Sequence, residues 1–388
     1  MNKFAIVTLL SLAALALPLA AEDNPFLGPF KTPFDTPPFD RIQLAHYKPA
    51  LLEGMKRQQA EIDAITADPK APTFENTIVA LDMSGQLLGE VGNVFFSLLT
   101  AATSREMQDL ASEMAPLLAA HQDNIALNEK LFARVKAVYD RRARLKLDSV
   151  QRYLLENTYK GFVRSGALLD AGQKERLREI NKEHSLLALK FSDNVLAETN
   201  SSTIVLDKAE DLAGLPAGVV SEAAETAKAM GLEGKWVFTA QKTSWIPFLQ
   251  YSPRRDLRQA LFSCFFMRGD RDNDKDNKGV LQRLLVLREE RYRLLGYRTP
   301  ADFYIEPRMA GTPARVDAFL RQLWTPALAR AKAERDEMQQ IADREGGGFR
   351  LQPWDWWYYA EKLRKAKYDL DDSALRPYFK LENVQQGM

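Results

Sequence analysis

Residues 74–98 read FENTIVALDMSGQLLGEVGNVFFSL, and this stretch indicates the class of fold. Its apolar side chains recur at steps of three or four residues, or at the sum of the two, which is the spacing of one face of an α-helix. The residues on that face are Ile78, Leu81, Leu88, Val91, Phe95 and Leu98. Thr73 stands just before the stretch and is suited to cap it. The pattern predicts an amphipathic helix with one buried face.

Helical signals continue along the rest of the chain. Residues 103–106 (TSRE) have the capping-box pattern and predict a helix near Met107 to Ala120. Asp170 opens another helix, with Leu177, Ile180, Leu187 and Phe191 on one side. Further helices are expected from residues 252–254 and from Asp276. Thr312 before Pro313 predicts a helix start, and the glycines at 346–348 predict its end.

Residues 201–251 differ in sequence pattern from the helical stretches around them, and this difference predicts a small α+β insert. Residues 203–206 (TIVL) and 235–239 (KWVFT) are short β-prone runs, and a helix containing Val220 and residues 224–227 is expected between them. The predicted fold is therefore mainly α. We expect a helical region over residues 22–200, the insert over 201–251, and a second helical region over 252–388.

The first 21 residues have the layout of a secretory signal peptide. A positive start at residues 1–3 precedes an apolar run, residues 4–17, that is too short for a comfortable bilayer span. Pro18 breaks the run, and two alanines come before an acidic pair. We expect export, with residues 1–21 removed and no membrane span afterwards; an uncleaved anchor is the alternative. The Pro- and Phe-rich residues 22–44 that follow predict an extended arm packed on the body.

The composition is that of a soluble globular protein, with 46% hydrophobic and 27% charged residues. Lys plus Arg total 53 and Asp plus Glu total 52, so the formal net charge is +1. A nucleic-acid binder needs a basic excess, and this balance argues against nucleic acid as a partner. Cys264 is the only cysteine, so an intramolecular disulfide is excluded. Its apolar neighbours predict a small buried side chain rather than a nucleophile.

Residue spacing alone identifies no catalytic, metal-binding or cofactor-binding residue. The three histidines are His46, His121 and His184, and none has another histidine three or four residues away, as a zinc helix requires. The glycines at 346–348 lack the Lys-Ser/Thr of a phosphate loop, and no Gly-x-Ser-x-Gly elbow is present.

An acidic run resembles a calcium loop at first sight; its members are Asp270, Asp272, Asp274 and Asp276. It lacks the glycine and the glutamate that an EF-hand needs at its sixth and twelfth positions. We expect these carboxylates to cap the helix that begins near Asp276 and to match its dipole.

The aromatic run Trp354–Tyr359 is the most unusual stretch, with five aromatic side chains in six residues. One helical face cannot bury them all. Some are expected to face the core, and others to pack on a neighbouring element or to line a groove that could hold a peptide.

A family resemblance rests on this run together with a series of segments in chain order. They are residues 24–27 (NPFL), 75–78 (ENTI), 131–135 (LFARV), 294–297 (LLGY), 308–313 (RMAGTP), 353–355 (PWD), 358–359 (YY), 361–362 (EK), 368–371 (YDLD) and 375–379 (LRPYF). The series resembles the thimet oligopeptidase family of zinc metallopeptidases, in its bacterial peptidyl-dipeptidase (dipeptidyl carboxypeptidase) branch. The likeness covers about residues 24–388.

The resemblance implies a multi-helix lobe of a two-lobed zinc peptidase fold that surrounds a channel for short peptides. In the family, zinc sits on a His-Glu-x-x-His helix in the carboxy-terminal half, and the glutamate acts as general base. This sequence contains no such motif. No catalytic, metal-binding or cofactor-binding residue is therefore carried over, and zinc is expected in the full-length family but not in this chain.

Three interpretations are considered. The first is a periplasmic peptidyl-dipeptidase truncated before its zinc helix and inactive alone, with short peptides and a separate catalytic half as partners. Such a truncation predicts a large exposed apolar surface. The second is a non-catalytic exported helical module that binds peptides or a partner chain. The third is an enzyme that uses a site not recognised in the sequence.

Overall fold

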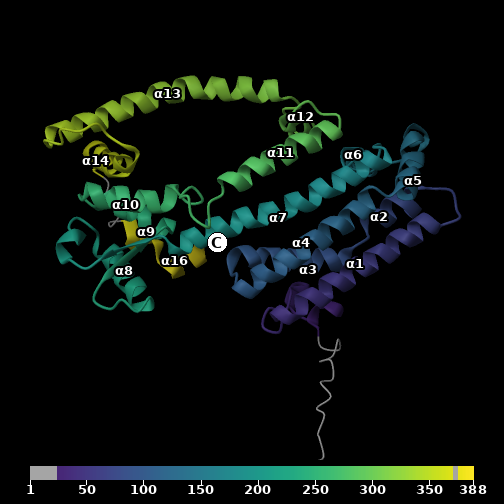
Figure 1. Cartoon of the computed structure of the whole chain (residues 1–388), viewed down its shortest axis with the longest axis horizontal. Coiled ribbons are helices and arrows are strands. Elements are labelled where there is room, and N and C mark those ends of the chain that lie inside the picture. The colour runs from purple at the N-terminus through teal and green to yellow at the C-terminus, as the bar shows by residue number, and fades with distance from the viewer. Residues whose placement is uncertain (1–23, 370–374) are drawn as a thin grey trace, which may run out of the picture. The chain divides into compact units, whose positions relative to one another are not determined.

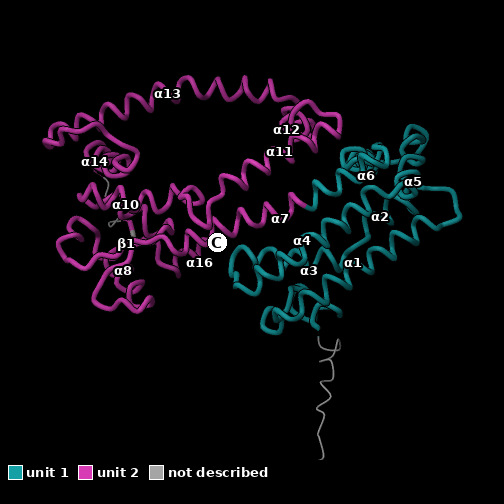
Figure 2. Tube along the Cα trace, in the orientation of Figure 1, with its two compact units in different colours: residues 1–182 teal, residues 183–388 magenta. Residues whose placement is uncertain are grey.

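The computed structural model describes residues 24–369 and 375–388, and nearly all of its regular structure is helical (Figure 1). The predicted mainly α fold class is confirmed. The expected signal peptide, residues 1–21, lies outside the described residues. The chain forms two compact units, Met1–Lys182 (unit 1) and Glu183–Met388 (unit 2) (Figure 2). None of the described helices is both long and apolar enough to cross a membrane.

Unit 1 is a helical body. Its helices are α1 (Leu44–Ala67), α2 (Ala80–Asp82), α3 (Gln86–Ala101), α4 (Arg105–Ala126), α5 (Glu129–Asp140), α6 (Ser149–Arg164) and the first part of α7 (Ala171–Ser201), which continues into unit 2. Helix α1 packs on α3 and α4, and α5 packs on α6. A core fills the space among them and includes Ile62, Ile78, Leu131, Val135 and Leu155. Burial of these apolar faces supplies most of the stability of helices of this length.

The first predicted helix is interrupted in the structure. The Thr73 hydroxyl accepts a hydrogen bond from the Asn76 amide at 3.1 Å, so Thr73 is an N-cap as predicted. The capped segment is a π-helical turn, Phe74–Val79, and α2 follows it directly. Gly85 then adopts a φ of 76°, in the left-handed region that favours glycine, and separates α2 from α3. The predicted face is buried at Ile78, Val91 and Phe95, but the prediction of one continuous helix was wrong.

Two other predicted helix starts in unit 1 are found with small differences. Helix α4 begins at Arg105, and its N-cap is Ser104 rather than Thr103, because the Ser104 hydroxyl accepts the Met107 amide at 3.2 Å. It also extends to Ala126, beyond the predicted end at Ala120. Asp170 accepts the Gln173 amide at 2.8 Å and begins α7 where the sequence predicted it.

The amino-terminal arm packs on unit 1 through fewer aromatic side chains than expected. Phe26 is buried, and its ring lies 5.3 Å from that of Tyr47 on α1, which in turn contacts Phe95 at 5.2 Å. Phe34 and Phe39 are exposed instead. The expectation that the interleaved aromatics as a group pack on the body was therefore wrong for these two.

Unit 2 contains the predicted small α+β insert. Strand β1 (Thr203–Leu206) pairs antiparallel with β2 (Trp236–Thr239), with Leu206 opposite Trp236. Helix α8 (Ala217–Ala229) connects the strands and packs on β2. Helices α9 (Lys242–Tyr251) and α10 (Arg255–Phe266) complete a core that we call the insert core. Its buried side chains include Leu206, Val219, Phe238, Trp245, Phe248 and Leu261.

The described part of unit 2 has further helices. They are α11 (Lys278–Leu294), α12 (Pro300–Ile305), α13 (Pro313–Arg344), α14 (Trp356–Tyr368) and α16 (Leu381–Gly387). Their lengths run from 6 residues in α12 to 32 residues in α13. The Thr312 hydroxyl accepts the Arg315 amide at 3.4 Å, and Pro313 is the first residue of α13. Glu345 ends this helix, and Gly346 follows with a φ of 76°. Both predicted limits of α13 are confirmed.

Candidate functional site

The two histidines of unit 1 form hydrogen bonds with different groups, and neither partner is a His, Cys, Asp or Glu side chain. His46 lies in the first turn of α1, where its Nδ1 accepts the Gln43 backbone amide at 3.0 Å. His121 lies on α4 and is nearly buried, with its Nε2 2.8 Å from Oε1 of Gln58. Burial lowers the pKa of His121, because a charged imidazolium is poorly solvated there. Each of these imidazoles therefore has a structural hydrogen bond of its own.

The third histidine, His184, lies on α7 in unit 2 among cations. Burial and the nearby guanidinium groups of Arg291 and Arg288 lower its pKa. Over residues 24–369 and 375–388, no group of three or more His, Cys, Asp or Glu side chains could hold a metal ion. The donor set that zinc needs is not assembled by these side chains, and the described residues do not fit the zinc site that the family resemblance implies.

Cys264 is buried on α10, within the insert core. Burial raises the pKa of its thiol, and the nearby Arg271 opposes this shift only in part. A protonated thiol is a poor nucleophile at neutral pH. The interpretation of Cys264 as a small buried apolar side chain is therefore confirmed by its position.

The acidic run of the 267–277 loop surrounds a lysine. The ammonium of Lys278 lies 2.8 Å from Asp270, 3.0 Å from Asp272 and 2.6 Å from Asp276. These hydrogen bonds raise the pKa of Lys278 and lower that of Asp276 to about 2. Asp276 also accepts the Lys278 backbone amide at 2.8 Å, at the first residue of α11. Asp276, next to the N-cap residue Asn277, thus has the predicted helix-start role. Asp270 and Asp272 pair with Lys278 and Asp274 pairs with Lys275, so the prediction that they cap the helix was wrong.

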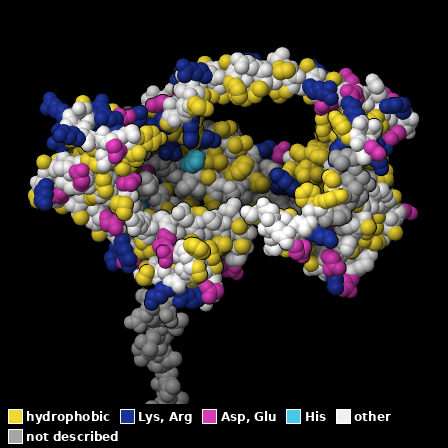
Figure 3. All heavy atoms as spheres, turned by 180° about the vertical axis from the view of Figure 1, so that it is seen from behind, with side chains coloured by type: hydrophobic (Ala, Val, Ile, Leu, Met, Phe, Trp, Pro, Cys, Tyr) yellow, Lys and Arg dark blue, Asp and Glu magenta, His cyan; other side chains and the backbone are white. Residues whose placement is uncertain are grey.

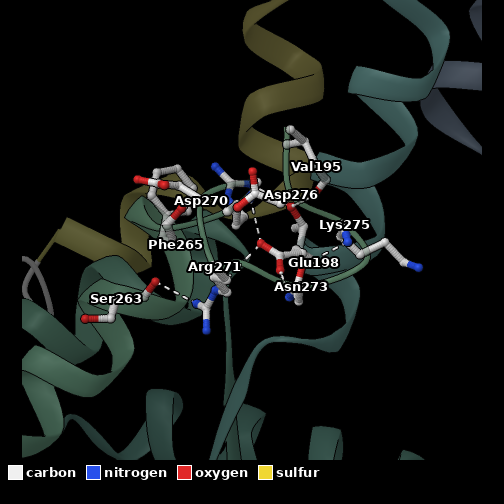
Figure 4. Close-up of polar contacts among 12 residues, drawn as sticks. Val195, Glu198, Ser263, Phe265, Asp270, Arg271, Asn273, Lys275 and Asp276 are labelled. Atoms are coloured by element: carbon white, nitrogen blue, oxygen red, sulfur yellow. Dashed lines mark hydrogen bonds and ion pairs between the residues drawn. The ribbon is translucent and has the colours of Figure 1, made fainter. Parts of the chain in front are cut away.

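A buried glutamate on α7 holds the same loop in place, and no sequence pattern indicated it. Glu198 accepts the Gly269 amide and the Asn273 side-chain amide, both at 2.6 Å (Figure 4). The Arg271 guanidinium lies 3.6 Å away and supplies a compensating charge. Because both carboxylate oxygens have donors, Glu198 is a structural residue that fixes the loop on α7.

A second buried carboxylate lies inside the aromatic run. Asp355 is fully buried and accepts hydrogen bonds from Arg255 at 3.0 Å and from Arg258 at 2.8 Å. Arg258 is buried as well, and its guanidinium lies 4.3 Å from the centre of the Tyr358 ring. We call this group the Asp355 cluster; it joins the start of α14 to α10. No spacing in the sequence relates Asp355 to the two arginines, which precede it by 100 and 97 residues, so sequence reasoning missed the cluster.

The aromatic run divides between two cores. The Trp357 ring lies 5.2 Å from that of Trp245, in the insert core. Tyr359 is buried against α13 beside Met338 and Ala342. Trp356 is partly exposed. The expected division of these rings between the core and a neighbouring element is therefore observed, while a peptide-binding groove along them stays a prediction.

Unit 1 contains a pocket with an uncharged lining. Its volume is about 300 Å³, and its polar lining residues are Gln58, Ser84, Gln122, Thr158 and Ser165. Leu81, Ile125 and Phe162 contribute apolar surface. Such a lining can hold a neutral polar or apolar group through amide and hydroxyl hydrogen bonds, but it offers no cation to bind a carboxylate.

Comparison with known proteins identifies relatives across nearly the whole chain. Residues 248–388 match the sequence model of peptidase family M3. The chain is 39% identical over 361 residues to the dipeptidyl carboxypeptidase of Escherichia coli, in a match that covers 93% of this chain and 53% of that protein. The dipeptidyl carboxypeptidase of Salmonella typhimurium is 38% identical over 363 residues, covering 94% and 53%.

Oligopeptidase A of Escherichia coli matches at lower identity, 29% over 366 residues, covering 93% of this chain and 54% of that protein. The chain thus spans about half the length of the curated relatives it matches. The predicted resemblance to the thimet oligopeptidase family, in its peptidyl-dipeptidase branch, is confirmed.

Proposed function

We propose that this chain, a relative of the thimet oligopeptidases in their peptidyl-dipeptidase branch, is one lobe of a zinc peptidase that releases dipeptides from the carboxyl end of short peptides. The observation that carries the proposal is the 39% identity with a dipeptidyl carboxypeptidase over 93% of the chain. Zinc in such an enzyme polarises the scissile carbonyl and activates a water molecule.

We also propose that the zinc ligands and the general base come from residues outside this sequence. Two observations support this. The sequence has three histidines and no His-Glu-x-x-His motif. His46 and His121 are engaged with Gln43 and Gln58, and the described donors assemble no metal site. The described residues assemble no metal site that would activate water, so we expect the chain alone to leave peptides intact.

A peptidase assay tests both parts of the proposal. The purified chain, with added zinc, is incubated with an amino-blocked pentapeptide that has a free carboxyl end, and mass spectrometry measures the released dipeptide. The assay is repeated with the chain co-expressed with the part of Escherichia coli dipeptidyl carboxypeptidase outside the match. We expect no release by the chain alone and chelator-sensitive release by the pair.

A matched variant tests the origin of the zinc ligands. The triple variant His46→Gln, His121→Gln and His184→Gln, shown to be folded by circular dichroism, is expected to leave dipeptide release by the pair unchanged. Chelator-sensitive release by the chain alone, or loss of release in the folded triple variant, would contradict the proposal. Peptide binding without cleavage by the chain alone would instead favour a non-catalytic module.

We further propose that the protein is exported to the periplasm after removal of residues 1–21. The support is the sequence layout of those residues alone, a positive start, an apolar run and small residues before an acidic pair. Amino-terminal sequencing of protein from a periplasmic extract tests this. A mature start at Glu22 is expected, and intact protein starting at Met1 in the cytoplasmic fraction would contradict it.

A further inference from the structure

The middle of α13 is a helix without a covering layer. All residues from 317 to 327 are exposed. Among the described elements, α12 packs on this helix near its start and α14 packs on it near its end. An isolated helix in water is only marginally stable, and most helices in proteins depend on a buried apolar face.

This exposed segment nevertheless carries an apolar face with regular helical spacing. We call it the α13 stripe, and it consists of Val316, Phe319, Leu320, Leu323, Trp324 and Ala327. Its four large side chains are between 54% and 64% exposed. Figure 3 shows hydrophobic side chains along much of this helix. The steps of three and four residues are those of a helix face that packs against a partner.

The α13 stripe continues a face of the same helix that is already covered. Leu320 and Met338 are 18 residues apart, which is about five full turns, so they point in the same direction. The same separation relates Leu323 to Ile341. At the covered end, Met338 and Ala342 are buried against Tyr359 of α14. The same side of α13 is therefore packed at the end of the helix and open along its middle, with the ion pair of Arg330 and Glu334 between the two parts.

We propose that the α13 stripe is the docking surface for the part of an M3 peptidase that has no counterpart in this chain. This inference rests on the proposed function. Two observations select that occupant. The chain spans 53% of the length of the dipeptidyl carboxypeptidases it matches, so their remaining length is available to cover the stripe. The segment that matches the M3 family model, residues 248–388, includes the whole of α13.

Charge also favours an apolar partner surface over an acidic or basic one. Arg321 pairs with Asp317 at 2.7 Å, and Arg330 pairs with Glu334 at 2.8 Å, so these cations are neutralised within the helix. The stripe itself has no charged member. An interface of this kind gains its affinity from burial of the Phe319, Leu320 and Trp324 side chains, and large aromatic residues commonly dominate such binding.

A pair of matched variants tests the docking surface. Leu320→Glu with Trp324→Glu places two charges on the stripe. Ala318→Glu with Gln322→Glu places the same two charges on the opposite side of the same helix. Each full-length chain is co-expressed with the non-matching part of Escherichia coli dipeptidyl carboxypeptidase, and the affinity of the purified pair is measured. We expect the stripe variant to lose at least about 100-fold in affinity and the control variant to change less than about threefold.

A cross-linking measurement tests the same docking surface without introducing charges. Trp324→p-benzoylphenylalanine places a photoreactive group on the stripe, and Ala318→p-benzoylphenylalanine places it opposite. Cross-links to the peptidase fragment from position 324, and few from position 318, are expected. Equal affinity of the stripe and control variants would overturn the proposal, as would failure of the pair to associate. Self-association of the chain that only the stripe variant abolishes would identify a second copy as the occupant and overturn it too.

The outcomes for docking and for function are separable. A pair that forms through the stripe but releases no dipeptide supports the docking surface and contradicts the proposed peptidase activity. Dipeptide release that the stripe variant leaves unchanged supports the activity and contradicts the docking surface.

Discussion

Two apolar groups within unit 2 differ in whether the chain itself covers them. In the insert core, side chains from β1, β2 and α8 to α10 bury one another, and Phe248 and Leu261 are inaccessible to solvent. Along the middle of α13, Phe319, Leu323 and Trp324 recur with the same regularity but are more than half exposed. The difference shows that apolar periodicity specifies which face of a helix is to be buried, and does not specify which polypeptide buries it.

The largest loss of stability is expected from a substitution in the Asp355 cluster, where charged side chains of unit 2 are buried. Asp355→Ala leaves the buried Arg258 without its carboxylate and should lower the free energy of unfolding by about 3–5 kcal/mol. Asp256→Ala, which removes an exposed ion pair with Arg254 on the same segment, should cost less than about 1 kcal/mol. All six tryptophans lie in unit 2, so urea denaturation followed by tryptophan fluorescence measures both. Equal stability of the two variants would contradict the assignment of the cluster.

The next largest loss of stability is expected from a substitution in the insert core that removes apolar atoms only. Leu261→Ala in the insert core removes a fully buried side chain and should cost about 2–5 kcal/mol, because lost burial and a residual cavity add. The same fluorescence-detected denaturation measures it. A cost below about 1 kcal/mol would mean that the insert core tolerates a cavity and is less tightly packed than its burial indicates.

The stability of unit 1 is expected to depend on pH through His121, which is nearly buried. Burial lowers its folded-state pKa below the ordinary value near 6.5, so the unfolded chain binds a proton that the folded chain does not. The stability that depends on neutral His121 is complete above about pH 6.5 and is lost as the pH falls towards the folded pKa. Denaturation of unit 1 between about pH 7 and 5, followed by circular dichroism, should show this loss in the parent chain and a smaller one in His121→Gln. Identical pH profiles would contradict it.

The smallest effect is expected on the α13 stripe. Leu323→Ala removes the same atoms as Leu261→Ala, but its side chain is already exposed in this chain, and alanine favours the helix. The free energy of unfolding should therefore change by less than about 0.5 kcal/mol. A cost close to that of Leu261→Ala would mean that the stripe is covered within the chain, and the contrast between the two regions would disappear.

Local signals allowed much of the fold to be predicted. The helix starts at Asp170 and Thr312 have caps whose side chains form the expected hydrogen bonds, and Gly346 ends α13 by its positive φ. These features depend on neighbours in sequence. The break at Gly85 was missed because the apolar spacing continues through it, while its left-handed backbone conformation is not visible in that spacing.

The buried charged groups could not be predicted for a different physical reason. Asp355 meets Arg255 at a separation of 100 residues, and Glu198 meets Gly269 at a separation of 71. Such contacts depend on tertiary packing, which residue spacing does not encode. The isolation of the three histidines, by contrast, was visible in the sequence, since a zinc helix needs two of them within four residues.

Hydrogen exchange of the chain alone tests most directly whether the middle of α13 lacks a partner. The backbone amides of residues 316–327 (Pro326 has none) and of residues 338–344 belong to the same helix, and α14 covers the second segment while the first is uncovered. In the monomeric chain, the amides of 316–327 should exchange at least about 100-fold faster than those of 338–344, because local opening there breaks few tertiary contacts. Equal protection of the two segments in a monomer would contradict the account, since it would show that the chain itself stabilises the stripe.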